Sequence, residues 1–224
     1  MSQVLLETRS LTKVYHETGE RLEILRGVDF AMFAGEIVVL TGSSGSGKST
    51  FLNLIGALDK PTSGAILFKG KDLATFRPSA RDQFHRHHVG FVFQFHHLLS
   101  EFSALENVML PARIAGMPPP ECLERAEGLL ETVGLAGRLR HLPRELSGGE
   151  RQRVAVARAL MNQPDMVLAD EPSGNLDESN AEKLNELFAE LNQKLGQTFL
   201  IVTHDSRLAG LATRCVHMQG GLIL

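Results

Sequence analysis

The 224-residue chain contains only two cysteines, Cys122 and Cys215, which lie far apart with no motif around either. This scarcity excludes a disulfide framework and a zinc site, and it fits a protein of a reducing compartment. An excess of charge of either sign is also lacking, since 23 lysines and arginines stand against 26 aspartates and glutamates, a net charge of −3. Such a balance argues against a general nucleic-acid-binding protein, so we expect no nucleic-acid partner.

Long apolar runs are absent as well. No stretch approaches 18 apolar residues, so we expect no segment that spans a bilayer. The first ten residues, M-S-Q-V-L-L-E-T-R-S, lack the apolar core of a signal peptide. An apolar fraction of 43% and a charged fraction of 22% are ordinary for a globular protein and exclude disorder, collagen and coiled coil. The length then predicts a single domain over residues 1–224.

The pattern of apolar residues predicts a mixed architecture. Residues 1–40 read as short strands (4–6, 11–15 and 24–33) that pair in an antiparallel subdomain, followed by a buried strand over 36–40. A helix is expected over 49–58 and further strands over 65–69 and 89–93. From about residue 98 to 160 the period becomes helical, with one helix between Pro120 and Gly134 and another over 148–162.

Strand and helix alternate again after the helical stretch. Strands are expected over 166–169 and 198–203, a helix over 180–195, and a last piece with a glycine turn over 215–224. Alternation of this kind predicts an α/β fold with a mainly parallel core sheet and helices on both faces. We therefore assign residues 1–94 and 163–224 to a catalytic core with its β subdomain, and 95–162 to an inserted α-helical subdomain.

A glycine-rich turn matches the phosphate-loop pattern G-x-x-x-x-G-K-[ST] at every fixed position, between a predicted strand and a predicted helix. Glycines allow backbone N–H groups to surround phosphate oxygens, and the helix N-terminus adds positive potential. The lysine neutralises β- and γ-phosphate charge, and the following serine hydroxyl ligates Mg²⁺. The residues assigned to nucleotide binding here are Gly42, Ser43, Ser44, Gly45, Ser46, Gly47, Lys48, Ser49 and Thr50.

Two acids, Asp170 and Glu171, follow the apolar run 166–169. Ligands bind outside the carboxyl ends of strands in such sheets, so both acids are expected beside the phosphate loop. Asp170 can hold Mg²⁺ through its water shell, while Glu171 can take a proton from an attacking water. Taken alone the pair could be two solvated acids at a turn, but the nearby phosphate loop favours the catalytic interpretation.

The segment L-S-G-G-E-R-Q supports two interpretations. Ser147 and Glu150 form the pattern of a capping box before an apolar-periodic helix. However, Gly148 and Gly149 leave the start of that helix bare, and glycine costs up to about 1 kcal/mol relative to alanine in a helix. A bare helix N-terminus with a serine hydroxyl is also suited to bind an anion.

Together with the phosphate loop and the Asp-Glu strand, L-S-G-G-E resembles the ATP-binding subunits of ABC transporters over essentially the whole chain, with the motifs in the same order. The resemblance implies a P-loop ATPase that uses ATP and Mg²⁺. It also implies a homodimer, in which Ser147, Gly148 and Gly149 of one copy contact the γ-phosphate held by the other. Glu150 stands where many members have glutamine, which keeps the capping box intact.

The same resemblance gives roles to four more residues. Gln94 is similar to the glutamine that senses Mg²⁺ and reports to membrane subunits, and His204 to the histidine that holds the γ-phosphate. Asp177 resembles the aspartate that links the two sites. Tyr15, the only tyrosine, matches the aromatic that stacks on adenine; the alternative for it is a partly buried strand aromatic.

The Gly174-Asn175 pair before Asp177 departs from the commoner Ser-Ala of the family. The contacts of this loop are therefore not carried over from the resemblance.

The resemblance also implies partners. The strings L-A-D-E-P-S-G-N-L-D and F-Q-F-H-H-L-L resemble the branch whose membrane subunits act as mechanical levers, and within it the lipoprotein-releasing complexes of Gram-negative bacteria. Two integral membrane subunits would then dock on residues 95–108, at the cytoplasmic face of the inner membrane. The alternatives are a related complex for macrolide export or cell division, and a soluble ABC ATPase that serves no transporter.

Overall fold

The computed structural model describes residues 4–17, 20–204 and 206–224. Its strands are β1 (Val4–Glu17), β2 (Glu20–Phe33), β3 (Ile37–Thr41), β4 (Ser63–Phe68), β5 (Lys71–Asp72), β6 (Val89–Phe93), β7 (Met166–Asp170), β8 (Thr198–Val202), β9 (Arg214–Gln219) and β10 (Leu222–Ile223). Its α-helices are α1 (Lys48–Ile55), α2 (Pro78–His87), α3 (Ala104–Ile114), α4 (Pro119–Thr132), α5 (Gly148–Leu160), α6 (Glu178–Leu195) and α7 (Ser206–Ala209).

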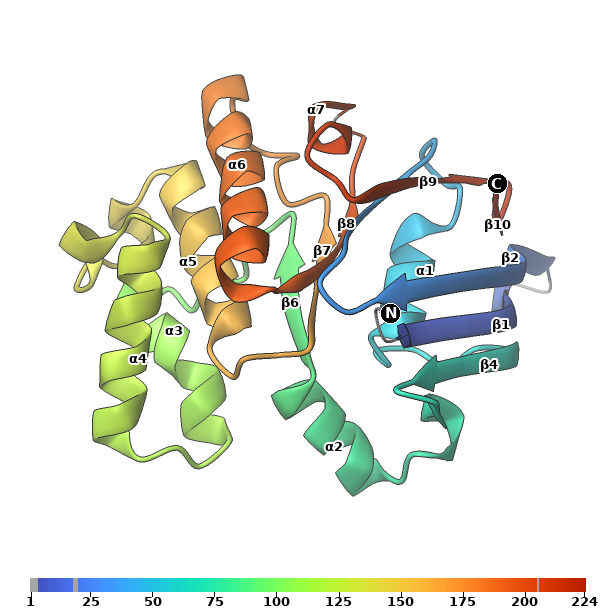
Figure 1. The fold of residues 1–224 in the computed structure, drawn as a ribbon, viewed down its shortest axis with the longest axis horizontal. Coiled ribbons are helices and arrows are strands. Elements are labelled where there is room, and N and C mark those ends of the chain that lie inside the picture. The colour runs from blue at the N-terminus through green and yellow to red at the C-terminus, as the bar shows by residue number, and fades with distance from the viewer. Residues whose placement is uncertain (1–3, 18–19, 205) are drawn as a thin grey trace.

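Two sheets organise the described residues (Figure 1). The larger sheet has the order β10-β9-β3-β8-β7-β6, in which all neighbours pair in parallel except β10 with β9. The smaller sheet has the order β2-β1-β4-β5 and is antiparallel throughout. Both the mainly parallel core and the antiparallel N-terminal sheet were predicted from the sequence, and the structure confirms them.

The core sheet is buried on both faces, and its side chains alternate between two apolar clusters. Ile37 and Val39 of β3 pack with helices α3 to α6, whereas Val38 and Leu40 pack with α1 and the antiparallel sheet. This period of two is the geometric signature of a strand covered on both sides. Figure 1 shows the same arrangement, with α3 to α6 on one side of the core strands and β1, β2 and β4 on the other.

The N-terminal strands are longer than predicted. The pieces expected over 4–6 and 11–15 form one continuous strand, β1, which pairs with β2 through several irregularities. Ser10 has a φ of 43° at one of them, and its N–H donates to the Asp29 carboxylate at 2.7 Å. A bulge of this kind interrupts the alternation of side chains, which is why the pattern reads as two strands.

The helices also differ from the prediction in detail. α1 ends at Ile55, before Gly56, so that Leu58 lies beyond it and is 49% exposed. α2 was not predicted at all. Only one of its side chains, that of Phe84, is buried, so the helix has almost no apolar stripe to read from sequence.

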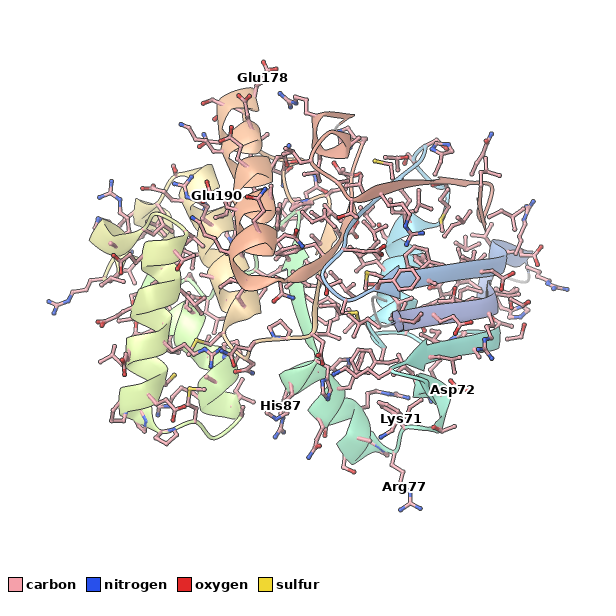
Figure 2. The ribbon with its side chains drawn as sticks, viewed as in Figure 1. Lys71, Asp72, Arg77, His87, Glu178 and Glu190 are labelled. Atoms are coloured by element: carbon pink, nitrogen blue, oxygen red, sulfur yellow. The ribbon has the colours of Figure 1, made fainter. Side chains whose placement is uncertain are left out.

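The longest described helix, α6, packs one of its faces against the core sheet. Leu184 and Phe188 are buried on that face, whereas Glu178 and Glu190 extend into solvent (Figure 2). None of the described helices is both long enough and apolar enough to cross a membrane.

Close packing of β6 against α5 depends on a glycine. A Cβ at Gly90 would lie 2.3 Å from the main-chain oxygen of Ala159, closer than any van der Waals contact allows. We predict that Gly90→Ala lowers the free energy of unfolding by about 2 kcal/mol, because one element must shift. Urea unfolding followed by circular dichroism measures this.

The matched control is Gly128→Ala on α4, where an added Cβ would meet no atom within 4 Å. Since alanine favours a helix over glycine, this variant should gain about 0.5–1 kcal/mol. Equal effects of the two substitutions would contradict the packing explanation.

Candidate functional site

Residues that follow four parallel strands meet at one edge of the core sheet. Gly42 follows β3, Gln94 follows β6, Glu171 follows β7 and His204 lies just beyond β8. They surround a cavity of about 510 Å³. The described residues that line it are Ile24, Gly42, Ser44, Gly45, Gly47, Lys48, Ser49, Thr50, Gln94, Glu171 and His204. The structure therefore brings together most of the residues that the sequence assigns to one site.

The phosphate loop presents backbone N–H groups rather than side chains at the start of α1. Gly45 and Gly47 have φ angles of 77° and 105°, which glycine adopts at little cost. Gly47 is the N-cap of α1, and no side chain caps the helix or places an acid in its first turn. The first N–H groups of α1 thus have no side-chain acceptor, which is the arrangement of an anion-binding helix start.

Lys48 extends back along this loop. Its Nζ atom donates to the main-chain oxygens of Gly42 and Ser43, both at 2.9 Å, and its side chain is almost buried. Beside it the Oγ atom of Ser46 is buried and has no hydrogen-bond partner among the described residues. Because a buried hydroxyl without a partner costs free energy, the loop is chemically suited to a ligand with many acceptor oxygens.

Ser49 and Asp170 form the pair expected to hold Mg²⁺. The Ser49 hydroxyl donates to Oδ1 of Asp170 at 3.1 Å. Partial burial raises the pKa of the Asp170 carboxyl, and the neighbouring Glu171 charge adds to this, while the Ser49 hydrogen bond opposes it. Hydroxyl, carboxylate and the Gln94 amide supply only oxygen ligands, which is the donor set that Mg²⁺ prefers. The residues present therefore fit this ion.

Glu171 stands in an unusual backbone conformation next to His204. Its φ is 47°, a left-handed value that non-glycine residues rarely adopt. Its N–H donates to the main-chain oxygen of Val202 at 2.8 Å, which fixes the turn to the end of β8. Its Oε2 lies 2.9 Å from Nδ1 of His204, and both side chains line the cavity. A carboxylate held in this way can accept a proton from a water in the cavity.

Some functional residues were not identified from the sequence. Ile24 of β2 lines the cavity, and no motif marks it. Gln152 of α5 is buried and donates from Nε2 to the main-chain oxygen of Phe93, next to Gln94. A polar residue on the apolar face of a predicted helix could have indicated this contact. Asn175 bonds to Gln94, a contact that depends on two loops far apart in sequence.

The L-S-G-G-E motif lies away from this cavity. Ser147 caps α5 and forms a capping box with Glu150, as predicted. A Cβ at Gly149 would lie 2.5 Å from the Asn180 side chain, so Gly149 allows α5 to approach α6. Asp177 caps α6, and its hydrogen bonds with Asn180 lower the pKa of its carboxyl. None of Ser147, Gly148, Gly149 and Asp177 lines the phosphate cavity of the same chain.

Tyr15 makes contacts of its own. Its hydroxyl donates to Asp59 at 2.7 Å, and Nζ of Lys13 lies 4.6 Å from the centre of its ring. Burial raises the pKa of this phenol, and the contact with Asp59 adds to the shift. Tyr15 is absent from the lining of the phosphate cavity, so stacking on adenine stays a prediction.

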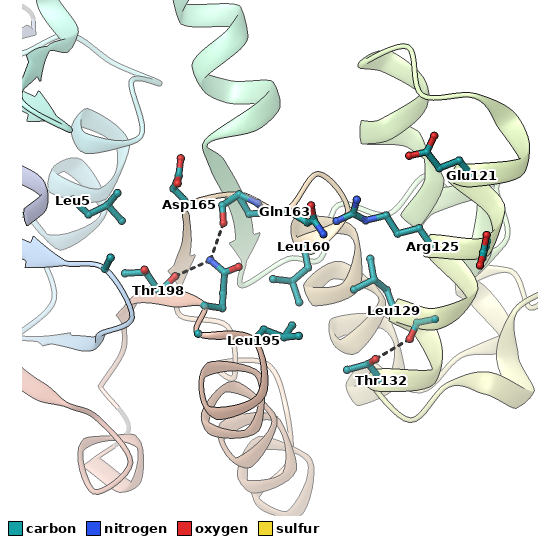
Figure 3. A pocket seen from close by; sticks show the side chains of 16 residues that line it. Leu5, Glu121, Arg125, Leu129, Thr132, Leu160, Gln163, Asp165, Leu195 and Thr198 are labelled. Carbon is teal, nitrogen blue, oxygen red and sulfur yellow. Dashed lines mark hydrogen bonds between the residues drawn. The ribbon is translucent and has the colours of Figure 1, made fainter. Parts of the chain in front are cut away.

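A larger cavity, of about 920 Å³, lies at the opposite edge of the sheet (Figure 3). Its lining includes Asp165, which precedes β7, and Thr198, the first residue of β8, together with Arg125 and Thr132 of α4. None of the residues predicted to act on nucleotide lines it. The amino ends of the strands therefore border a cavity that lacks the predicted nucleotide-binding residues, which lie at the carboxyl ends.

Comparisons with known proteins agree with this geometry. The family model described as ABC transporter matches residues 25–174. The lipoprotein-releasing system ATP-binding protein LolD of Idiomarina loihiensis is 49% identical over 223 residues, covering 100% of this chain and 98% of that protein. The LolD of Legionella pneumophila is 50% identical over 221 residues, covering 99% and 97%.

Among solved structures, the ATP-binding cassette MJ0796, a dimer in a post-hydrolysis state bound to ADP and Pi, is similar to this chain with a TM-score of 0.89. It is 37% identical, and the match covers 98% of this chain and 96% of that one.

The capping box of α5 contains an ion pair that makes stability depend on pH. A hydrogen bond from Arg138, at 2.8 Å, and the main-chain N–H of Ser147 lower the pKa of Glu150 from 4.5 to about 2. A depressed carboxyl pKa stabilises the fold above pH 4.5, and this contribution is lost as the pH falls toward 2. We predict that Glu150→Gln costs about 1–2 kcal/mol of unfolding free energy at pH 7.

The deficit of Glu150→Gln should shrink as the pH is lowered from 7 to 3.5, as measured by urea unfolding. Glu106→Gln is the matched control, because Glu106 forms the same capping box with Ser103 on α3, and its partners among the described residues include no arginine. It should cost less at pH 7. A deficit of Glu150→Gln that is constant with pH would contradict the assignment.

Proposed function

The chain belongs to the ABC transporter family, and from this premise we propose how its residues couple ATP hydrolysis to the release of lipoproteins from the inner membrane. It is an ABC-type ATPase and, like relatives about half identical to it over nearly their full length, the ATP-binding subunit of a lipoprotein-releasing system. The α-helical insertion over 95–162 acts as a subdomain beside the catalytic core of 1–94 and 163–224.

The observation that carries the proposal is one cavity that gathers a lysine, a glutamate and a histidine around an uncapped helix start. In the proposed reaction the N–H groups of the phosphate loop and Lys48 bind the β- and γ-phosphates of ATP. Glu171 takes a proton from the water that attacks the γ-phosphate. His204 donates to the γ-phosphate from one ring nitrogen, while its main-chain N–H, 3.4 Å from Oε2 of Glu171, orients that carboxylate.

Ser49, Asp170 and Gln94 are the residues that would hold Mg²⁺ in this site. When bound, the ion would neutralise negative charge that develops on the phosphate oxygens. The protein contributes a hydroxyl, a carboxylate and an amide, and it keeps Asp170 next to the phosphate loop through the Ser49 hydrogen bond.

Two copies of the chain form the working unit in this proposal. At the start of α5, Ser147 is exposed, Gly148 is half-buried and Gly149 is buried, and none of the three lines the cavity of their own chain. A second copy can present this start to the γ-phosphate, and Asp177 can link the two sites. The dimeric state of the similar cassette MJ0796 supports this arrangement. ATP then acts by binding the closed pair better than the open one.

Membrane subunits are the second kind of partner that we propose. Phe95, Leu99 and Phe102 are exposed directly after Gln94, and Phe95 is 67% exposed. Arg158 supports this segment by donating to the main-chain oxygens of His96 and His97, both at 2.7 Å. Two integral membrane proteins docked here would hold the chain at the cytoplasmic face of the inner membrane. The relatives do not favour macrolide export, cell division or a soluble role.

Replacing the proposed base tests the chemistry. Glu171→Gln should retain ATP binding but lower turnover by about 10²–10⁴-fold, because an amide cannot take the proton. The bound pair should then accumulate as an ATP-loaded dimer, visible by size-exclusion chromatography. Glu190→Gln, on the solvent face of α6 (Figure 2), is the control and should leave turnover unchanged. Normal turnover of Glu171→Gln would remove Glu171 from this role.

Replacing the cap of α5 tests whether the site is shared. Ser147→Arg should abolish hydrolysis without weakening the affinity of the monomer for a fluorescent ATP analogue, because Ser147 acts on the other copy's nucleotide. Ser103→Arg removes the equivalent cap of α3 and should leave hydrolysis by the isolated chain intact. A large loss of nucleotide affinity in monomeric Ser147→Arg would argue against a site between two copies.

A further inference from the structure

Gln94 and Asn175 form a reciprocal pair of hydrogen bonds. Gln94 follows β6 and Asn175 lies in the loop after β7, and these two strands pair in parallel up to Phe93 and Asp170. Nε2 of Gln94 donates to Oδ1 of Asn175 at 3.1 Å. Nδ2 of Asn175 donates to the main-chain oxygen of Gln94 at 3.3 Å. The loop that carries Glu171 is thus joined to Gln94 through both ends of one side-chain amide.

This pair determines which way both amides face. A main-chain oxygen can only accept, so the Asn175 atom that faces the oxygen of Gln94 must be its NH₂ group. The other atom of that amide is then Oδ1, which can only accept as well. The Gln94 atom that faces it must therefore be Nε2. One backbone carbonyl fixes the orientation of two side chains in succession, and the Oε1 atom of Gln94 takes no part in the pair.

The orientation matters because Gln94 lines the phosphate cavity with Ser49 and Glu171. A divalent hard cation, or a water bound to it, is met by an amide oxygen and not by an NH₂ group. With the opposite orientation Gln94 would offer its NH₂ group to the cation and its oxygen to the loop. Asn175 selects the orientation in which the oxygen is available.

Gly174 makes room for this contact. A Cβ at residue 174 would lie 3.0 Å from Nε2 of Gln94 and 3.3 Å from the main-chain oxygen of Glu171. The N–H of Gly174 also donates to that Glu171 oxygen at 3.0 Å. Gly174 and Asn175 therefore act together: Gly174 lets the loop approach Gln94, and Asn175 forms the hydrogen bonds with Gln94.

We propose that Asn175 is a positioning residue that orients the Gln94 amide so that its Oε1 atom faces the Mg²⁺ of the bound nucleotide. The inference rests on the proposed function, because it assumes that Mg-ATP occupies the cavity. The inference predicts that Asn175 affects metal binding only when residue 94 has a side-chain amide, because only then do its two terminal atoms differ.

A double-mutant cycle tests this statement. The affinity for Mn²⁺, used in place of Mg²⁺, is measured by electron paramagnetic resonance on the full chain with a non-hydrolysable ATP analogue. Asn175→Ala should weaken Mn²⁺ binding by about 10-fold, as the loss of an orienting partner does at metal sites. In a Gln94→Glu background the same substitution should not weaken Mn²⁺ binding, because a carboxylate has two equivalent oxygens and no N–H to donate to Oδ1 of Asn175.

Asn175→Leu, which keeps the size of the side chain and removes its polar atoms, should reproduce both results. Asn192→Ala is the control, since Asn192 also bonds two main-chain oxygens, those of Gly35 and Gln197, but far from the cavity. It should leave Mn²⁺ affinity unchanged. Equal weakening in both residue-94 backgrounds, or none in either, would overturn the role of Asn175. A native chain that binds the analogue but shows no bound Mn²⁺ when Mn²⁺ is added would instead overturn the proposed metal site and this inference with it.

Discussion

Parallel pairing of β6, β7, β8 and β3 places the ends of four strands at one edge of a sheet that is buried on both faces. Asp170 pairs with both Phe93 and Val202, and Leu40 pairs with Val202 as well. A slip of one residue would exchange the side chains of the two apolar clusters, so burial of the sheet enforces the register. The positions of Gln94, Glu171 and the phosphate loop relative to one another follow from this constraint, and so does the chemistry of the cavity.

Only some of the described helices begin with a side-chain cap. Ser103, Ser147 and Asp177 cap α3, α5 and α6, whereas α2 and α4 begin with proline and no side-chain cap, and α1 begins at Gly47 with neither. The start of α1 lies in the cavity and is suited to phosphate. The Ser147 hydroxyl accepts the N–H of Glu150 and lies exposed at the start of α5. One chain therefore carries a phosphate-binding loop and, elsewhere on its surface, a second helix start, which the proposed function assigns to the nucleotide of the other copy.

The functional residues that the sequence identified are those that belong to short motifs of neighbouring residues. The phosphate loop and the S-x-x-E capping box each lie within eight residues, and the structure places both as predicted. What escaped prediction depends on contacts between distant segments or on weak patterns. α2 buries only Phe84, and Ile24 reaches the cavity from the antiparallel sheet. The partners of Asn175 are set by which strands neighbour each other, and no local periodicity carries that information.

The turn between β7 and α6 joins three parts of the site through consecutive hydrogen bonds. Glu171, with its left-handed backbone, accepts from Gly174; Ser173 accepts from Leu176; and Asp177 then caps α6. Asn175 stands inside this series and bonds to Gln94 outside it. A displacement of Gln94 by a docked partner must therefore either break that pair or move the turn that holds Glu171. Because the turn is also bonded to the end of β8 through Val202, breaking the pair would change the direction of the Gln94 amide, and moving the turn would change the position of Glu171. In the proposed function, either change would couple a partner docked on residues 95–108 to the γ-phosphate.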